Sequence, residues 1–167
     1  MTTFVRVATI GDATVIGEVA AAAWRDTYTG LLRPATIEQF IAAAYSVETI
    51  VRRIERDTFI VADVDDSVRA FADAVEREGH VALAAIYAEP SWRGHGLGLA
   101  LLDELRRRFP GQAIAADVLV GNRLGEAFYE RRGFVARETL EADLFGEPVR
   151  ERRWWLGEPS PTRAPSV

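Results

Sequence analysis

Residues 80–109 read HVALAAIYAEPSWRGHGLGLALLDELRRRF, and this stretch decides the fold. Its first part, 80–88, is apolar on both faces, which predicts a strand in the centre of a sheet. A glycine-rich turn follows at 91–98. From Leu97 to Phe109 apolar residues recur at helical spacing, and three arginines close the segment, where a helix dipole favours cations. The sequence therefore predicts a strand, a tight turn and a helix.

The turn contains Gly94, Gly96 and Gly98. Backbone N–H groups at a helix N-terminus bind anions, and glycine lets a ligand approach the chain closely. A phosphate would fit here without a lysine, and all 20 basic residues of the chain are arginine. A Walker A loop needs a lysine and is excluded, and the glycine spacing does not match the dinucleotide fingerprint G-x-G-x-x-G. Taken alone, the stretch also fits a plain glycine-rich turn.

Hydrophobic spacing outward from this unit predicts the other elements. Strands are expected at 4–8, 58–64, 68–76, 80–88, 113–120, 134–144 and 149–156, and helices at 12–28, 34–45, 47–55, 97–109 and 122–132. Strands and helices in this order predict one mixed α/β domain, 1–157, with a mostly antiparallel seven-stranded sheet flanked by helices. We expect the proline-containing tail, 158–167, to be disordered.

Composition narrows the class of function. The chain has 167 residues, 49% of them hydrophobic and 27% charged, with a net charge of -5, which is typical of a soluble globular protein and argues against nucleic acid as a partner. No membrane-spanning run or secretory signal is seen, so we expect a cytoplasmic protein without a membrane partner. The chain lacks cysteine, and its two histidines are His80 and His95. The sequence therefore predicts no metal site.

A second motif, NRLGEAFYERRGF, occupies 122–134. On a helix, Asn122, Gly125 and Tyr129 would share one face. Glycine costs about 1 kcal/mol against alanine inside a helix, and close approach of a ligand is one reason to tolerate it. The alternative is that Tyr129 only packs at the helix edge.

Together these motifs resemble the GNAT superfamily of N-acetyltransferases. The pattern R-x-x-G-x-G, present as Arg93, Gly96 and Gly98, resembles the coenzyme A loop of that family. The second motif resembles the family signature N-x-x-A-x-x-F-Y-x-x-x-G-F, with Gly125 in place of the alanine. FGEPVRERRWW near the end resembles the closing hairpin, and AWRDTYTGLL at 23–32 resembles the first helix on the acceptor side.

The resemblance implies a sheet whose central strands splay at the coenzyme A site, with acetyl-CoA as co-substrate and no metal. It implies direct attack of an amine on the thioester, with Tyr129 protonating the departing thiolate. Trp24 and Tyr28 would contact the acceptor. The expected donor-binding residues are Ile86, Tyr87, Ala88, Arg93, Gly94, His95, Gly96, Leu97, Gly98 and Asn122.

The general base is the point at which this chain departs from the family. Many members carry a glutamate at the position of Ala82. If the hairpin turn were centred on Glu76–Gly79, Asp73 would pair with Ala82 and lie beside the missing carboxylate. His80 would lie two residues away on the same face. Asp73 and His80 are therefore candidate catalytic residues, and a solvated position in the hairpin is the alternative for each.

Three functions remain open at this stage. The first is acetylation of a primary amine of a small molecule, such as a polyamine. The second is acetylation of protein N-termini. The third is a non-catalytic sensor of acyl-CoA, which the absent glutamate favours slightly and Tyr129 and Asn122 argue against. A longer acyl-CoA as donor and a homodimeric assembly also stay open.

Overall fold

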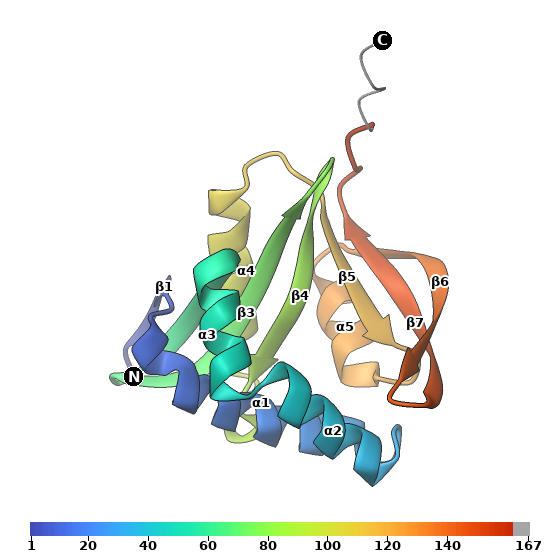
Figure 1. Ribbon diagram of the computed structural model, residues 1–167. Coiled ribbons are helices and arrows are strands. Elements are labelled where there is room, and N and C mark those ends of the chain that lie inside the picture. The colour runs from blue at the N-terminus through green and yellow to red at the C-terminus, as the bar shows by residue number, and fades with distance from the viewer. Residues whose placement is uncertain (162–167) are drawn as a thin grey trace.

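A computed structural model describes residues 1–161, and Figure 1 shows its elements arranged around one sheet. The strands are β1 Thr3–Val7, β2 Thr58–Val64, β3 Ser67–Arg77, β4 His80–Ala88, β5 Ile114–Leu119, β6 Val135–Leu144 and β7 Glu147–Leu156. The helices are α1 Ala13–Tyr28, α2 Pro34–Ala44, α3 Val47–Arg56, α4 Leu97–Arg108 and α5 Arg123–Arg131. All predicted elements are present, with boundaries shifted by a few residues.

The sheet has seven strands in the order β1-β2-β3-β4-β5-β7-β6. Every neighbouring pair is antiparallel except β4 and β5, which are parallel and joined through α4. A parallel pair needs a long crossover connection, and the helix predicted after the glycine turn supplies it. The predicted mixed, mostly antiparallel sheet is confirmed.

The central strands β4 and β5 splay apart, as the resemblance implied. Their pairing is restricted to Val81 with Ile114 and Ala82 with Ala115. Beyond these pairs the two strands diverge towards the end of β4 that leads into the glycine turn (Figure 1). Backbone groups of β4 past Ala82 are therefore not used by β5.

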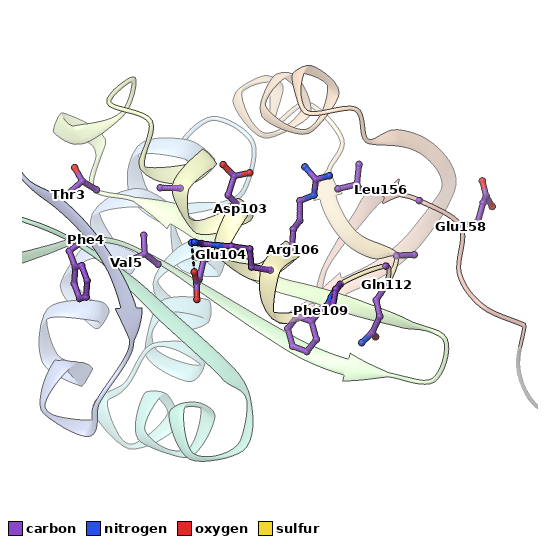
Figure 2. Close-up of a pocket in the computed structure, with 16 residues that line it drawn as sticks. Thr3, Phe4, Val5, Asp103, Glu104, Arg106, Phe109, Gln112, Leu156 and Glu158 are labelled. Atoms are coloured by element: carbon purple, nitrogen blue, oxygen red, sulfur yellow. Dashed lines mark hydrogen bonds and ion pairs between the residues drawn. The ribbon is translucent and has the colours of Figure 1, made fainter.

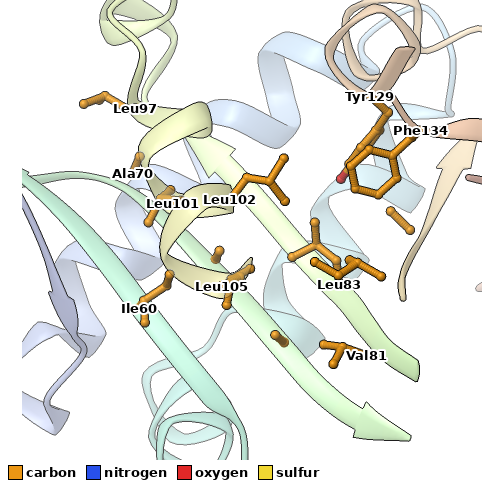
Figure 3. Packing of buried hydrophobic residues seen from close by; sticks show 14 of the residues in the cluster. Ile60, Ala70, Val81, Leu83, Leu97, Leu101, Leu102, Leu105, Tyr129 and Phe134 are labelled. Atoms are coloured by element: carbon orange, nitrogen blue, oxygen red, sulfur yellow. The ribbon is translucent and has the colours of Figure 1, made fainter. Parts of the chain in front are cut away.

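Helices cover the sheet on both faces. On one face, α4 lays Leu101, Leu102 and Leu105 against β2, β3 and β4 (Figure 3). On the other face, α1 and α3 pack a second apolar cluster that includes Ile16, Ile50 and aromatic side chains. α3 begins at a cap in which Ser46 Oγ accepts the Thr49 N–H at 3.2 Å. β4 therefore lies between two packed layers.

The predicted register of the β3–β4 hairpin is wrong. Its turn is the two-residue loop 78–79, so Arg77 pairs with His80 and Ala82 pairs with Val75. Gly79, with φ of +81, supplies the left-handed conformation that such a tight turn requires. A bulge after Asp73 then shifts the pairing by one residue, which a sequence pattern does not reveal.

β7 ends at Leu156, one residue before the predicted domain boundary. Past it, Glu158 pairs with Arg137, and the Ser160 N–H donates to the carbonyl of Gly79 at 2.9 Å. The rest of the predicted disordered tail, 162–167, lies outside the described residues. Within 1–161 no helix is both long enough and apolar enough to cross a membrane.

Candidate active site

The glycine turn presents bare backbone at the start of α4. Gly94 and Gly96 both have φ of +78, and no atom lies within 4 Å of the position that a Cβ would take at either residue. Gly96 is the N-cap of α4, a helix of 12 residues. Free N–H groups, the helix dipole and open space combine there, so the turn fits an anionic phosphate group.

Two other predicted donor contacts have a packing role. A Cβ at Gly98 would lie 2.6 Å from Cε2 of Phe128, so this glycine lets α4 and α5 approach each other. Leu97 is 2% exposed and its side chain belongs to the core under α4. These residues can therefore contact a ligand only through their main-chain atoms.

The side chains at the edge of the turn point away from its open backbone. The Arg93 guanidinium pairs with Asp26 and donates to Thr27 Oγ1 at 3.1 Å, so it ties the turn to α1. The His95 ring lies against Trp92, and its Nδ1 is 3.2 Å from the Trp92 carbonyl oxygen. Arg93 therefore connects the donor side of the site to the helix expected on the acceptor side.

Main-chain groups of β4 face the gap between the splayed strands. The Glu89 N–H donates to the Arg69 carbonyl at 2.8 Å. Two residues earlier, the N–H of Tyr87 therefore also points towards β3, where Tyr87 pairs with Phe71. Because hydrogen-bonding direction alternates along an antiparallel strand, the N–H groups of Ile86 and Ala88 point towards β5. β5 does not pair with them. These two residues, rather than Tyr87, offer main-chain donors to a ligand in the gap.

Tyr129 lies in the core beside the gap. It is 7% exposed and packs edge-on against Phe134, with ring centroids 5.0 Å apart (Figure 3). Burial, with smaller contributions from Tyr28 and Asp117, raises its pKa well above the ordinary value of tyrosine. At neutral pH the phenol therefore keeps its proton and can donate it.

Asn122 caps α5 instead of lying on a helix face. Its Oδ1 accepts the Gly125 N–H at 3.0 Å. A Cβ at Gly125 would lie 2.7 Å from Asn122 Nδ2, so the missing side chain makes room for the cap. The prediction that Gly125 admits a ligand is replaced by this packing reason.

Aromatic residues of α1 and β4 meet on the opposite face of the sheet. The hydroxyls of Tyr28 and Tyr87 are 3.0 Å apart, and burial raises the pKa of both phenols. Trp24 stacks on Phe40 with centroids 3.9 Å apart and is 5% exposed. Tyr28 thus brings a polar atom to the site, whereas Trp24 mainly forms its wall.

A groove of about 600 Å³ opens beside Tyr28, between the end of α1 and the start of α2. It is lined by Arg25, Thr29, Gly30, Leu31, Leu32, Arg33, Pro34, Ile37, Glu38 and Glu147. Glu147 accepts the Arg33 N–H at 2.9 Å, which attaches the β6–β7 hairpin to this rim. Tyr28 and Tyr87 do not line the groove, which borders the end of α1 just after Tyr28.

Asp73 is committed to a buried ion pair. It is 1% exposed and accepts from Arg53 Nε at 2.8 Å under α3. Burial raises its pKa to about 7. The positive charge of Arg53 opposes this rise, and the nearby Asp57 adds to it. Its partner on β4 is Ala85, so the expected position beside Ala82 is wrong.

His80 begins β4, at the far end from the glycine turn, and packs edge-on against Trp155 at 5.1 Å. At about 3.3 Å per residue, it lies on the order of 26 Å along the strand from Ala88. The fold does not bring it to the gap between β4 and β5.

Sequence reasoning missed two carboxylates, Asp117 on β5 and Glu151 on β7. Asp117 receives two hydrogen bonds from Arg153, at 2.7 and 2.9 Å. Glu151 pairs with Leu119, which belongs to the same cluster as Tyr28. The alternation in VRERRWW indicated a strand, but which of its charges faces the site depends on a register set by the whole sheet.

A second hollow lies elsewhere on the molecule. It measures about 1300 Å³ and lies between β1 and the C-terminal end of α4, next to Phe109 and Gln112 (Figure 2). The glycine turn is at the opposite end of that helix. This hollow is therefore separate from the donor site. Within 1–161 no cluster of three or more metal-ligating side chains occurs.

An open backbone cradle at a helix start, splayed parallel strands and a buried tyrosine beside them form the kind of site that an acyltransferase needs. Comparison with known proteins agrees. The model of the acetyltransferase (GNAT) family matches residues 19–134, and the chain belongs to this family of acetyltransferases.

The relatives cover most of the chain. It is 26% identical over 152 residues to a spermidine N(1)-acetyltransferase of Thermoplasma acidophilum, covering 86% of this chain and 94% of that protein. The PaiA N-acetyltransferase of the same organism, solved in complex with coenzyme A, superposes with a TM-score of 0.80 at 25% identity over 91% of this chain and 98% of that chain. The Escherichia coli ribosomal-protein-S18-alanine N-acetyltransferase shares the fold, with a TM-score of 0.71 at 17% identity and 99% coverage of both chains.

Proposed function

We propose that this acetyltransferase uses acetyl-CoA to acetylate a primary amine of a small molecule, with a polyamine as the favoured class. The observation that carries the proposal is that a buried tyrosine, Tyr129, lies beside the gap between β4 and β5. The similarity to a spermidine acetyltransferase and to a structure containing coenzyme A supports the choice of both substrates.

The donor would be held by main chain. The N–H groups of the turn at Gly94 and Gly96 would receive its phosphates, and Arg93 would keep the turn attached to α1. The main-chain N–H groups of Ile86 and Ala88 would bind the pantetheine arm and the thioester oxygen in the gap between the strands. Asn122 would support the far side of the gap as the cap of α5.

Acetyl-CoA supplies an activated acyl group, so the protein needs no nucleophile of its own. Its tasks are to orient an amine, to remove a proton from it, and to protonate the departing thiolate. Tyr129 suits the last task by its position beside the gap and because its phenol is protonated at neutral pH. Its raised pKa makes it a weaker acid than an ordinary tyrosine, so the transfer has to be coupled to cleavage of the C–S bond, as negative charge develops on the sulfur.

The test is a panel of acceptors with acetyl-CoA, scored by release of free thiol. It contains spermidine, a diamine, an aminoglycoside and peptides with free N-termini. We expect release with the polyamines. Release with peptides alone would indicate a protein N-terminal acetyltransferase, and tight binding of coenzyme A without release for any amine would indicate a sensor.

A further inference from the structure

The carboxylates on the sheet and on the rim of the groove differ in how they are used. Asp73 is paired with Arg53, Glu147 receives a main-chain N–H, and Asp117 is held by Arg153. Within residues 1–161, the carboxylate of Glu151 has neither an ion pair nor a hydrogen bond. Its oxygens are not among the buried atoms that lack a partner, so this carboxylate is open to solvent and free to bind a cation.

Sheet register shows where this carboxylate points. Glu151 is the direct partner of Leu119, and paired residues project from the same face. Leu119 is buried in the cluster formed with Tyr28, and Tyr87 packs against that cluster. Val149, two residues before Glu151 on the same face, packs there as well. Glu151 therefore lies where the apolar cluster under α1 meets the open part of the sheet.

Charge around Glu151 favours a cation. The groups that face it are Asp117 from β5, Arg153 from its own strand and the Tyr28 hydroxyl from α1. Arg153 already donates two hydrogen bonds to Asp117, one from Nε and one from Nη2. The only arginine among these groups is therefore paired with Asp117, and Glu151 has no positive partner of its own in the described part of the chain. An ammonium group would supply the second positive charge.

We propose that Glu151 binds the ammonium group of the acceptor and takes its proton, in the role that Ala82 cannot fill. This inference rests on the proposed amine acetylation. One N–H bond of the ammonium breaks, the electron pair stays on nitrogen, and an O–H bond forms on the Glu151 carboxyl. The free amine then attacks the thioester, the C–S bond breaks, and Tyr129 protonates the sulfur. The amide nitrogen loses its second proton as Tyr129 is reprotonated, and Glu151 returns its proton to solvent.

The titration of Glu151 fits this role. Burial, and next the charge of Asp117, raise its pKa, while Arg153 opposes the rise. A carboxylate whose pKa is closer to neutrality is a better base towards an ammonium group than an ordinary glutamate. Its charge also acts on the Tyr28 hydroxyl, which places it in electrostatic contact with the tyrosine pair.

The kinetic test compares Glu151→Gln with Glu141→Gln, an exposed glutamate on the neighbouring strand, using spermidine from pH 6 to 10. For Glu151→Gln we expect kcat to fall about 10²-fold or more at pH 7. The loss should shrink near pH 10, because free amine then needs no base. Glu141→Gln should behave as the wild type. A loss that is the same at every pH would show a structural role and would overturn the proposal.

A second measurement does not depend on turnover. Carbon-13 detection of the carboxyl groups follows the titration of Glu151 in the protein with coenzyme A, with and without spermidine. We expect Glu151 to titrate above the ordinary range of glutamate and to shift to lower pH when spermidine binds. An ordinary titration that spermidine leaves unchanged would overturn the assignment of Glu151, even if the protein acetylates amines. Absence of acetylation with a normal spermidine-dependent shift would instead overturn the proposed function alone.

Discussion

At the scale of single residues, the same chemical group serves opposite purposes depending on its surroundings. Asp73 is enclosed under α3 with Arg53, whereas Glu151 lies on the sheet face that packs against Tyr28, with no partner among the described residues. Both carboxyls have a raised pKa, mainly through burial. The raised pKa of Asp73 should make the stability of the fold depend on pH, whereas the raised pKa of Glu151 should make it a better base.

Asp73 should make stability depend on pH. Its pKa rises from 3.8 unfolded to about 7 folded, so between these values the folded state keeps a proton that the unfolded state has lost. The free energy of unfolding should therefore fall as pH rises from about 4 to 7, by at most about 1.4 kcal/mol per pH unit, and then level off.

Urea unfolding at several pH values measures this slope. Asp73→Asn should flatten it, because asparagine has no proton to release and can still accept from Arg53. Exposed Asp103→Asn should keep the wild-type slope. An unchanged slope in Asp73→Asn would show that another group is responsible.

Tyr129→Phe should lower kcat about 10²–10⁴-fold, because the thiolate would leave without a proton donor. Affinity for coenzyme A, measured by calorimetry, should remain close to that of the wild type, since the hydroxyl is expected to act only as bonds break. Activity equal to that of the wild type would remove Tyr129 from the mechanism.

At the scale of elements, the glycines of the turn fall into two groups. Gly96 has a left-handed backbone with open space beside it, and Gly98 has an ordinary backbone with Phe128 of α5 against it. The first leaves the start of α4 accessible. The second sets the distance between α4 and α5. A motif that appears uniform therefore combines a binding role with a packing role.

Gly98→Ala should destabilise the protein by about 1–3 kcal/mol, because the added methyl group overlaps the Phe128 ring. Phe128→Leu should recover part of this loss in the double variant. Gly96→Ala, which suffers only backbone strain, should gain nothing from Phe128→Leu. A double-mutant cycle from urea unfolding measures the coupling. Equal effects of Phe128→Leu on both alanine variants would refute the packing role.

At the scale of the whole molecule, the site lies where the two halves of the sheet separate. β1 to β4 carry α1, α3 and α4, while β5 to β7 form the second half beside α5. Glu147 with Arg33 connects the two halves, and Arg93 with Asp26 ties the glycine turn to α1 within the first half. A donor bound between the strands would contact both halves and should stabilise the fold as a unit.

Coenzyme A at about 100 times its Kd should add about 2.7 kcal/mol to stability and raise Tm by roughly 5–10 °C. Gly96→Val should abolish this shift. Gly111→Val is the matched control, because Gly111 also has a positive φ and open space but lies at the other end of α4. If Gly96→Val keeps the full shift, the donor does not bind at the turn.

Local patterns determined much of this protein. Periodicity and turn residues predicted the twelve elements and the mixed sheet, and the motifs at 91–98 and 122–134 indicated the family. These signals are readable because strand and helix periods, and the conformational freedom of glycine, act over a few neighbouring residues.

Only the tertiary structure decided which residues face one another. A two-residue turn and one bulge moved Asp73 away from Ala82, and the packing of Phe128 and Asn122 explained Gly98 and Gly125. Glu151 reaches the cluster of Tyr28 through a strand pairing with Leu119, 32 residues earlier in the chain. Such pairings depend on the register of the whole sheet, in which a shift of one residue turns a side chain to the opposite face.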